Sequence, residues 1–394
     1  MDAIRELVEQ SIASIEYCSE LSEGQIWSTH GSCSIWRAER FSGSPQFYPI
    51  YRYGDYYSYS PLSLVFLKGT IHVNPRAARM ASSPRFRYYS ATGTIDREFI
   101  RLGGPQSSRA VIKDANEYAR RIAEGLCQDA HDVETAHPGF TNIILCGGKD
   151  SLNLALLPWT NPVLLVSAPP NYDLVKRFVA DNGLRYDVVR LDDNDRSLLE
   201  LEILVNFCRN NLEHCRWGPH LKRLADSFQR KVIFWKGQVG DVLMTPKWKE
   251  LRAAPNSLGY PSWVFKLLRG HGQSKFDRIL EETHLLQRYF SKVLWHRCAM
   301  WQGAHMSIIR QLTNSLVLSG YHGPAVQKVV QDVDFRKAVQ EDLRPRVGEY
   351  LLGKPVVYPA TNPAPALSEI RKGISHAEPL LRLLSRYGIA IYNR

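Results

Sequence analysis

The chain has 394 residues, of which 44% are hydrophobic and 23% are charged, and its formal net charge is +11. This composition is typical of a soluble globular protein that is long enough for two domains. No run of about 18 apolar residues is present, which excludes a transmembrane helix. The N-terminus lacks the apolar core of a signal peptide, and the seven cysteines are scattered without Cys-x-x-Cys spacing. We therefore expect a cytoplasmic protein without a zinc site.

The positive charge is concentrated in the N-terminal part of the chain. From Arg37 to Lys113 there are twelve Lys and Arg residues against four Asp and Glu residues. Such a surplus is typical of a solvated basic face, and it also fits a partner that carries phosphates or carboxylates. The run Arg85-Phe86-Arg87-Tyr88-Tyr89 interleaves arginines and aromatics, a pattern that can stack the bases of single-stranded nucleic acid. Aromatics of this kind more often pack within β structure.

The first elements predicted along the chain are a helix and a small β-rich domain. Five aliphatic residues at helical spacing predict an amphipathic helix over about residues 1–21, namely Ile4, Leu7, Val8, Ile12 and Ile15. A stretch rich in tyrosine and turn formers follows, with strands predicted over residues 62–66 and 70–73. The pattern changes near residue 105, so we predict a β-rich N-terminal domain over residues 1–105, whose role the sequence does not indicate.

From residue 107 onward, helical patterns alternate with short apolar runs. Buried strands are predicted over residues 143–145, 162–166, 186–191 and 232–235. Helices are predicted from about residue 112 to 126 and over residues 172–182, 197–212, 219–228 and 267–318. This alternation predicts an α/β domain over residues 106–394, built on a doubly wound parallel sheet with a helical C-terminal part. Ligands of such sheets bind beyond the carboxyl ends of the strands.

The segment Cys146-Gly147-Gly148-Lys149-Asp150-Ser151 lies between the first of these strands and a helix. A glycine pair lets the backbone come close to a phosphate, and a helix N-terminus supplies unpaired N–H groups. The spacing does not fit the P-loop of kinases, which ends in Gly-Lys-Ser/Thr. An ordinary strand-to-helix turn is the alternative interpretation. Ser167 lies at the end of the next predicted strand and therefore at the same edge of the sheet.

A second candidate segment, Lys236-Gly237-Gln238-Val239-Gly240-Asp241, follows the strand predicted over residues 232–235. Its aspartate would lie near the same crevice. Mg²⁺ prefers one or two carboxylates together with phosphate oxygens, and Asp150 and Asp241 would supply that pair. Taken alone, an aspartate in a loop is more often a turn or cap residue.

Three segments, in this order, resemble the synthetase domain of the asparagine synthetase superfamily, which includes the β-lactam synthetases. Residues 145–151 are similar to its Leu-Ser-Gly-Gly-x-Asp-Ser loop, and residues 236–241 to its Ser/Thr-Gly-Glu/Gln-Gly-x-Asp-Glu segment. Arg371-Lys372-Gly373 is similar to its late Arg-x-Lys element. The resemblance covers roughly residues 107–380 and implies the HUP-like fold of the PP-loop ATP pyrophosphatases.

The chain departs from the family pattern at several positions. Cys146 stands where the family has serine, Val239 where it has glycine, and Val242 where it has an acidic residue. Residues 319–324 do not match the usual Glu-x-Arg-x-Pro-Phe element, so the group that takes the proton of the incoming amine is unassigned. Met1 is followed by Asp2 instead of the nucleophilic cysteine of a glutaminase domain, and we expect no functional glutaminase.

The resemblance implies an ATP-dependent carboxylate–amine ligase that forms an amide through an acyl-adenylate, releasing AMP and pyrophosphate. Its cofactors would be ATP and Mg²⁺, with the metal on Asp150 and Asp241, and Lys372 would be a catalytic residue that neutralises developing charge. The residues implied in binding ATP and pyrophosphate share the two loops and the next strand end: Cys146, Gly147, Gly148, Lys149, Asp150, Ser151, Ser167 and Gly237.

The carboxylate and the amine would come from two substrates, or from one molecule or peptide. Two alternatives stay open. One is an enzyme of the same ATP-splitting type that modifies a nucleic-acid base, and the other is a non-catalytic nucleotide-binding relative.

Overall fold

The computed structural model describes residues 15–22, 35–42, 50–58, 64, 67, 72–73, 100–102, 110–191, 217–246, 309, 313, 315–359 and 390–391. The helix predicted over residues 197–212, most of the one predicted over 267–318, and the predicted catalytic Lys372 lie outside these residues. Among the described helices, none combines the length and the hydropathy that crossing a membrane would need.

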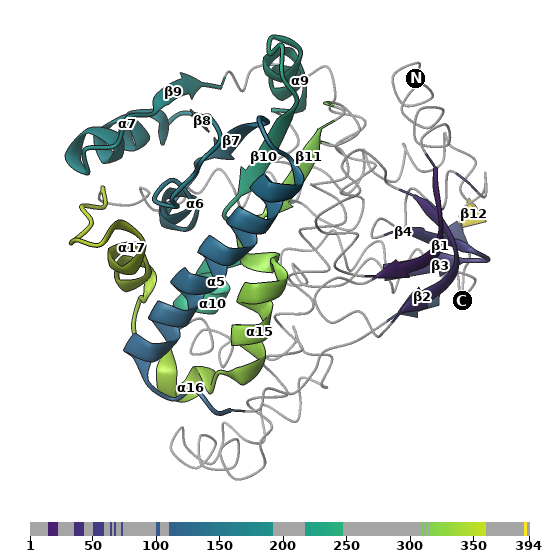
Figure 1. Cartoon of the computed structure of the whole chain (residues 1–394), viewed down its shortest axis with the longest axis horizontal. Coiled ribbons are helices and arrows are strands. Elements are labelled where there is room, and N and C mark those ends of the chain that lie inside the picture. Colours follow the sequence, from purple (N-terminus) through teal and green to yellow (C-terminus); the bar gives the residue numbers. More distant parts are fainter. Residues whose placement is uncertain are drawn as a thin grey trace.

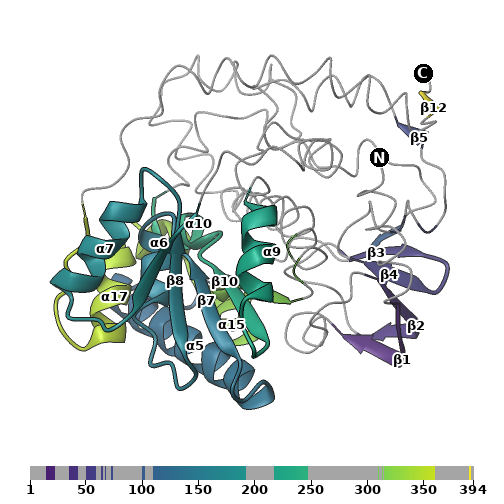
Figure 2. The ribbon, with the colours of Figure 1, turned by 90° about the horizontal axis from the view of Figure 1, so that it is seen from above.

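A five-stranded parallel sheet forms the centre of the larger part (Figures 1 and 2). Its order is β11-β10-β7-β8-β9, and all four neighbouring pairs are parallel. The strands are β7 (Thr141–Leu145), β8 (Val163–Ser167), β9 (Asp187–Arg190), β10 (Val232–Lys236) and β11 (Leu316–Ser319). The predicted α/β class and parallel sheet are confirmed, and the order is compatible with double winding. The strand order reverses between β7 and β10, which is where such sheets open a crevice.

Alternate residues of each strand face two separate apolar clusters. Ile144 and Trp235 belong to the cluster that includes the buried stripe of α5 (Ala115–Ala136). Ile143 and Phe234 belong to the other, which includes Leu221 of α9 (Gly218–Asp226). Because both faces of the sheet are covered, its central strands β7, β8 and β10 contain apolar runs, which is why these strands could be predicted from the sequence.

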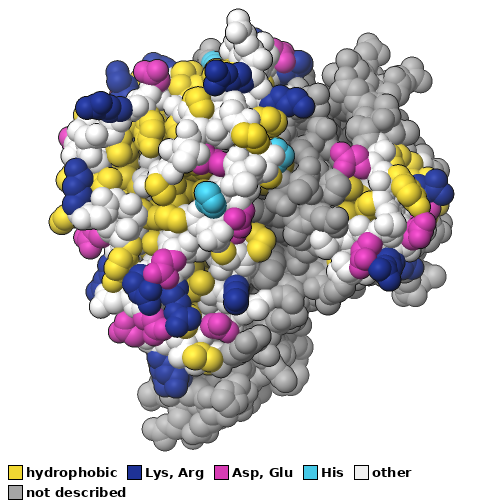
Figure 3. All heavy atoms as spheres, viewed as in Figure 1, with side chains coloured by type: hydrophobic (Ala, Val, Ile, Leu, Met, Phe, Trp, Pro, Cys, Tyr) yellow, Lys and Arg dark blue, Asp and Glu magenta, His cyan; other side chains and the backbone are white. Residues whose placement is uncertain are grey.

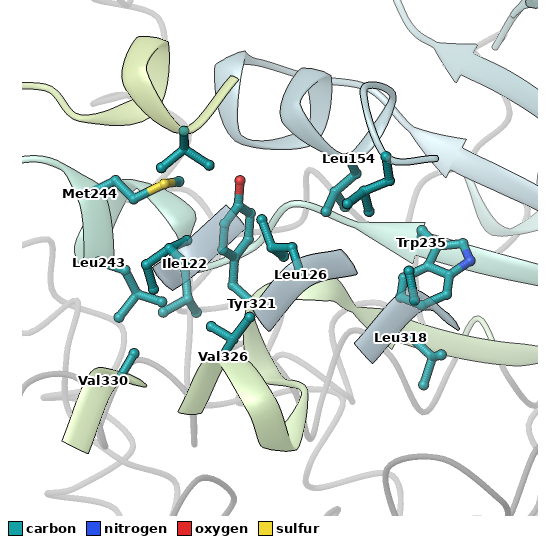
Figure 4. Packing of buried hydrophobic residues seen from close by; sticks show 14 of the residues in the cluster. Ile122, Leu126, Leu154, Trp235, Leu243, Met244, Leu318, Tyr321, Val326 and Val330 are labelled. Atoms are coloured by element: carbon teal, nitrogen blue, oxygen red, sulfur yellow. The ribbon is translucent and has the colours of Figure 1, made fainter. Parts of the chain in front are cut away.

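Helices from both ends of this part pack together on the face that carries α5. Figure 1 shows α15 (Pro324–Asp332) beside α5 on one side and α17 (Arg344–Leu352) on the other. The buried Tyr321 lies among Ile122, Leu126 and Val326, and its hydroxyl points away from Val326 (Figure 4). That hydroxyl donates a hydrogen bond of 3.0 Å to the backbone oxygen of Asp150, so this packing reaches the glycine-rich loop.

The short elements beside the site follow from local sequence. Helix α6 (Lys149–Leu154) begins directly after the glycine pair, and α7 (Tyr172–Asp181) ends before Gly183, which has a φ of +69°. A left-handed glycine just past a helix end is a common stop signal. Helix α10 (Gly240–Met244) follows β10. The 3-10 turn η4 (Gly320–His322), α15 and α16 (Phe335–Ala338) connect β11 with α17.

The described N-terminal residues form a second sheet, in the order β1-β2-β4-β3-β6. The β1–β2 pair is parallel and the other pairs are antiparallel. Its strands are β1 (Glu16–Ser22), β2 (Trp36–Ser42), β3 (Ile50–Tyr53), β4 (Tyr56–Ser58) and β6 (Ile100–Leu102). A separate pair joins β5 (His72–Val73) to β12 (Ala390–Ile391), so the end of the chain returns to its N-terminal part.

Three sequence-based predictions of elements are wrong where the structure describes them. Residues 16–21 are strand instead of helix. Of the five residues that predicted the helix, Ile15 is described and lies just before this strand, and the other four lie outside the described part. Leu64 has helical backbone instead of the predicted strand. Residues 316–318, predicted as the end of a long helical stretch, lie in β11, because a short apolar run fits a buried strand as well as a buried helix. The strand predicted over residues 70–73 is confirmed at β5.

His322 should make folding stability sensitive to acid. Burial lowers the pKa of its imidazole from 6.5 to about 3. The free energy of unfolding that depends on this neutral imidazole is therefore fully present above pH 6.5. It is lost as the pH falls toward 3, because protonation then favours the unfolded chain. Between pH 7 and pH 5 we expect the free energy of unfolding of the wild type to fall by about 2 kcal/mol relative to His322→Gln, measured by urea unfolding.

The comparison with the variant is needed because other buried groups act in the opposite direction. Burial raises the pKa of Asp129 and of Asp150 to about 7, and such groups add stability at low pH that is lost as the pH rises through 7. Both proteins share these two carboxyls, so their effects cancel in the difference. A difference that does not change between pH 7 and pH 5 would show that the imidazole titrates normally in the folded protein.

Candidate functional site

A cavity of about 660 Å³ lies beyond the carboxyl ends of β7, β8 and β10. It brings together every predicted site residue that the structure describes: Cys146, Gly147, Gly148, Lys149, Asp150, Ser151, Ser167, Gly237 and Asp241. It therefore coincides with the crevice expected where the strand order of the sheet reverses. Lys372 lies outside the described residues.

The glycine-rich loop closes on the hydroxyl of Ser151. The N–H groups of Gly147 and Gly148 donate to Ser151 Oγ at 2.9 and 3.3 Å, and the hydroxyl donates to Gly148 O at 2.9 Å. An anion at this loop would compete with the serine hydroxyl for the two N–H groups. A Cβ built on either glycine would meet no atom within 4 Å. Both α-carbons therefore face open space, and a ligand can approach the backbone closely.

The loop is held from the β8 side by two side chains. Ser167 Oγ donates to Cys146 O at 2.7 Å, and Asn171 Nδ2 donates to Gly147 O at 2.9 Å. The hydroxyl hydrogen of Ser167 is thus used to support the loop. Cys146 itself is buried, and burial raises the pKa of its thiol to about 12. The thiol is neutral at physiological pH and is not a nucleophile there.

The second loop packs tightly against the first. A Cβ on Gly237 would lie within 2.6 Å of backbone atoms of Asp150 and Ser151, and one on Gly240 would lie 2.8 Å from Asp150 Cβ. Only glycine fits such approaches, and they bring Asp241, the first residue after Gly240, toward Asp150. Val239 has a φ of +74°, in the left-handed region that costs a β-branched residue about 1–3 kcal/mol. This is the position where the family pattern has glycine.

Gln238 adds a polar group to the same wall. Both atoms of its side-chain amide are buried, and neither has a hydrogen-bond partner among the described residues. A buried amide without partners costs free energy that a ligand bound in the cavity would recover by hydrogen bonding. Gln238 matches the Glu/Gln position of the family segment, although it was not among the predicted site residues.

Acidic and basic side chains line the cavity next to the glycine-rich loop. Arg344 forms a two-pronged ion pair with Asp342, with Nε–Oδ1 and Nη2–Oδ2 distances of 2.7 and 2.8 Å. Its Nη1 is 3.5 Å from Asp150 Oδ1, and Lys149 Nζ is 3.4 Å from Asp342 Oδ2. Asp342 and Arg344 also line the cavity, although sequence reasoning missed them.

These charges shift the pKa of the carboxyls in opposite directions. Burial raises the pKa of Asp150 to about 7, and the nearby carboxylate of Asp241 adds to the rise against the lowering effect of Arg344. Burial also acts upward on Asp342, but its hydrogen bonds and ion pair with Arg344 outweigh burial and lower its pKa. Asp150 is therefore the carboxyl that would gain most from a cation.

Asp150 and Asp241 fit the predicted Mg²⁺ site. They line one cavity, and their mutual repulsion is the kind that a divalent ion relieves. Within the described part of the chain, no group of three or more His, Cys, Asp and Glu side chains could hold a metal. A metal held by these two carboxylates would therefore need water or ligand oxygens as well, which is the usual coordination of Mg²⁺ in phosphate-transfer sites.

Two arginines of the N-terminal sheet form ion pairs with acidic residues. Arg37 Nε is 2.6 Å from Asp55 Oδ2, and Arg40 Nη2 is 2.7 Å from Glu20 Oε2. On the face shown in Figure 3, Lys and Arg side chains of the described residues are interspersed with Asp and Glu side chains. The run Arg85-Phe86-Arg87-Tyr88-Tyr89, on which the alternative of a nucleic-acid partner depends, lies outside the described residues.

The chain matches no protein-family model and no curated protein sequence. Its function must therefore be inferred from the residues and the geometry of the cavity.

Proposed function

We propose that the cavity binds Mg·ATP and that the chain is an ATP-dependent carboxylate–amine ligase of the PP-loop kind. The observation that carries the proposal is the open glycine pair, Gly147 and Gly148, facing a cavity that also contains two adjacent carboxylates. The left-handed backbone of Val239, at a position where the family has glycine, gives independent support.

In this proposal the loops bind the phosphates and hold them for in-line attack. The N–H groups of Gly147 and Gly148 turn from Ser151 Oγ to oxygens of the pyrophosphate. Asp150 and Asp241 hold Mg²⁺, which when bound offsets the negative charge of the phosphates. Lys149, with its ammonium beside Asp342, adds a positive charge near the leaving group.

The reaction balances without a redox partner. A carboxylate oxygen of the substrate attacks the α-phosphorus, the bond to the bridging oxygen breaks, and pyrophosphate leaves with its electron pair. An amine then attacks the acyl carbon, AMP leaves, and the amine gives up one proton. Tyr321 is not the group that takes that proton at neutral pH, because burial raises its pKa well above the ordinary value. Two reacting groups held side by side in one cavity lower the barrier through positioning.

Calorimetric titration with Mg·ATP tests the proposal, with wild-type protein compared with Asp150→Asn. We expect binding by the wild type, and a loss of about tenfold or more in the variant, because the neutral amide no longer attracts the metal. Incubation of the wild type with ATP and pools of carboxylates and amines should then release AMP and pyrophosphate. Failure of the wild type to bind Mg·ATP would overturn the proposal.

One observation favours a non-catalytic nucleotide-binding protein as the second candidate. Val242, which replaces an acidic residue of the family pattern, lines the cavity, so an aliphatic side chain stands where the family pattern supplies a carboxylate. Binding of Mg·ATP without release of AMP or pyrophosphate in any substrate pool would select this candidate.

A further inference from the structure

Arg344 lies in the wall of the cavity and is held there by its backbone. It is the first residue of α17, and its N–H donates to Asp342 Oδ1 at 3.1 Å. Its backbone oxygen accepts hydrogen bonds from Asn153 Nδ2 at 3.1 Å and from the hydroxyl of Tyr358 at 3.2 Å. Asn153 belongs to α6, the helix that also carries Asp150. The backbone of Arg344 is therefore fixed relative to the glycine-rich loop.

The guanidinium is fixed as well. Asp342 accepts from Nε and Nη2 in the two-pronged geometry that suits arginine, and these contacts raise the pKa of Arg344 further above its already high value. A side chain that is already ordered loses little conformational entropy when it binds a ligand. An anion in the cavity would therefore meet a positive charge that is already in position.

The third contact of the guanidinium is the weakest. Nη1 is 3.5 Å from Asp150 Oδ1, beyond the range of good N–H···O hydrogen bonds, whereas both distances to Asp342 are within it. Arginine has five N–H donors, so the fork on Asp342 leaves the Nη1 hydrogens for another acceptor. A phosphate oxygen at a normal distance would be a better acceptor than Asp150 is.

We propose that Arg344 binds a phosphate group of the nucleotide through Nη1 and that Asp342 is its positioning residue. This inference rests on the proposed binding of Mg·ATP. It assigns to a described residue of α17 a charge that the sequence resemblance gave to Lys372, and it makes α17 part of the binding site.

The matched control is Arg346, two residues further along α17. Its Nη1 donates to Asn116 Oδ1 at 2.8 Å and its Nη2 contacts Glu341, and it is not among the residues that line the cavity. Arg346→Gln removes the same charge from the same helix turn as Arg344→Gln. A difference between the two variants therefore reports a direct contact and not the net charge of the helix.

The experiment measures the affinities of Mg·ATP and inorganic pyrophosphate by calorimetry, and that of adenosine by competition with Mg·ATP. We expect Arg344→Gln to lower the affinities for Mg·ATP and pyrophosphate by about tenfold to a hundredfold, with little change in the affinity for adenosine. Asp342→Asn should lower the affinities for the same two ligands by a smaller factor, because the guanidinium of Arg344 stays but is less well oriented. Arg346→Gln should match the wild type for all three.

Arg344→Lys is a second, more conservative variant that tests the inference if Arg344→Gln does not fold. The thermal unfolding midpoint of each protein shows which variants are folded. Arg344→Lys keeps the charge but not the fork, and we expect an affinity for pyrophosphate between those of the wild type and Arg344→Gln. If the wild type binds Mg·ATP and both Arg344 variants bind pyrophosphate as tightly as it does, this inference fails while the proposed function stands. If the wild type binds neither Mg·ATP nor pyrophosphate, both fail. If the Arg344 variants lose as much affinity for adenosine as for pyrophosphate, the inference is also overturned, because such a loss indicates a general distortion of the cavity.

Discussion

Replacing Gly148 by alanine is expected to weaken Mg·ATP binding by about tenfold to a hundredfold without unfolding the protein. Gly148 has a φ of −178°, extended backbone that alanine also adopts, and its Cβ would meet no protein atom within 4 Å. The added methyl group therefore costs the free protein little. It would lie in the space that a phosphate must enter to reach the N–H groups of the loop. Calorimetric titration and thermal unfolding of the variant measure the two effects separately.

Gly183→Ala is the control with the opposite pattern. Gly183 follows α7 with a φ of +69° and does not line the cavity, and no atom lies within 4 Å of its Cβ position. We expect this variant to lose about 1 kcal/mol of stability through backbone strain and to bind Mg·ATP normally. If Gly148→Ala binds Mg·ATP as tightly as the wild type, the loop is an ordinary strand-to-helix turn.

Four strands of the parallel sheet could be predicted from the sequence because their environment leaves a local signal. A strand covered on both faces contains an apolar run between turn residues, as β7, β8 and β10 do. The edge strand β9 is more exposed, and its signal is the pair Val188-Val189 between Asp187 and Arg190. The fifth strand, β11, was missed because its three apolar residues end a long segment with no clear period. For residues 16–21 of β1, the helical pattern upstream was extended too far. Their exposure instead alternates along the strand, as pairing with β2 requires.

The candidate site divides in the same way between local and long-range signals. The glycine-rich loop and Asp241 could be predicted because glycine and aspartate directly follow predicted strands, and parallel strands end at one edge of the sheet. Asp342 and Arg344 could not, since Arg344 is 194 residues from its contact Asp150. They reach the cavity because α17 packs against α5 and α6 and is tied to α6 through Asn153. The Asp-x-Arg-Pro run gives no indication of that docking.

Gly237→Ala is expected to have the largest effect on stability, a loss of at least about 3 kcal/mol. The new Cβ would lie within 2.6 Å of backbone atoms of Asp150 and Ser151, closer than any Cβ approaches other atoms in real structures. No rotamer relieves this overlap, because the atoms that must move are backbone atoms of α6. Their movement would break the hydrogen bonds from Gly147 and Gly148 to Ser151. Urea unfolding at neutral pH, followed by circular dichroism, measures the change.

Gly139→Ala separates this steric effect from the general cost of replacing a glycine. Gly139 has a φ of +75°, and no atom lies within 4 Å of its Cβ position. Its replacement should cost about 1 kcal/mol, from backbone strain alone. Equal losses in the two variants would mean that the loop after β10 does not pack against α6 as closely as the structure has it. Asp241 would then not be held beside Asp150, and the basis for a shared Mg²⁺ site would be lost with it.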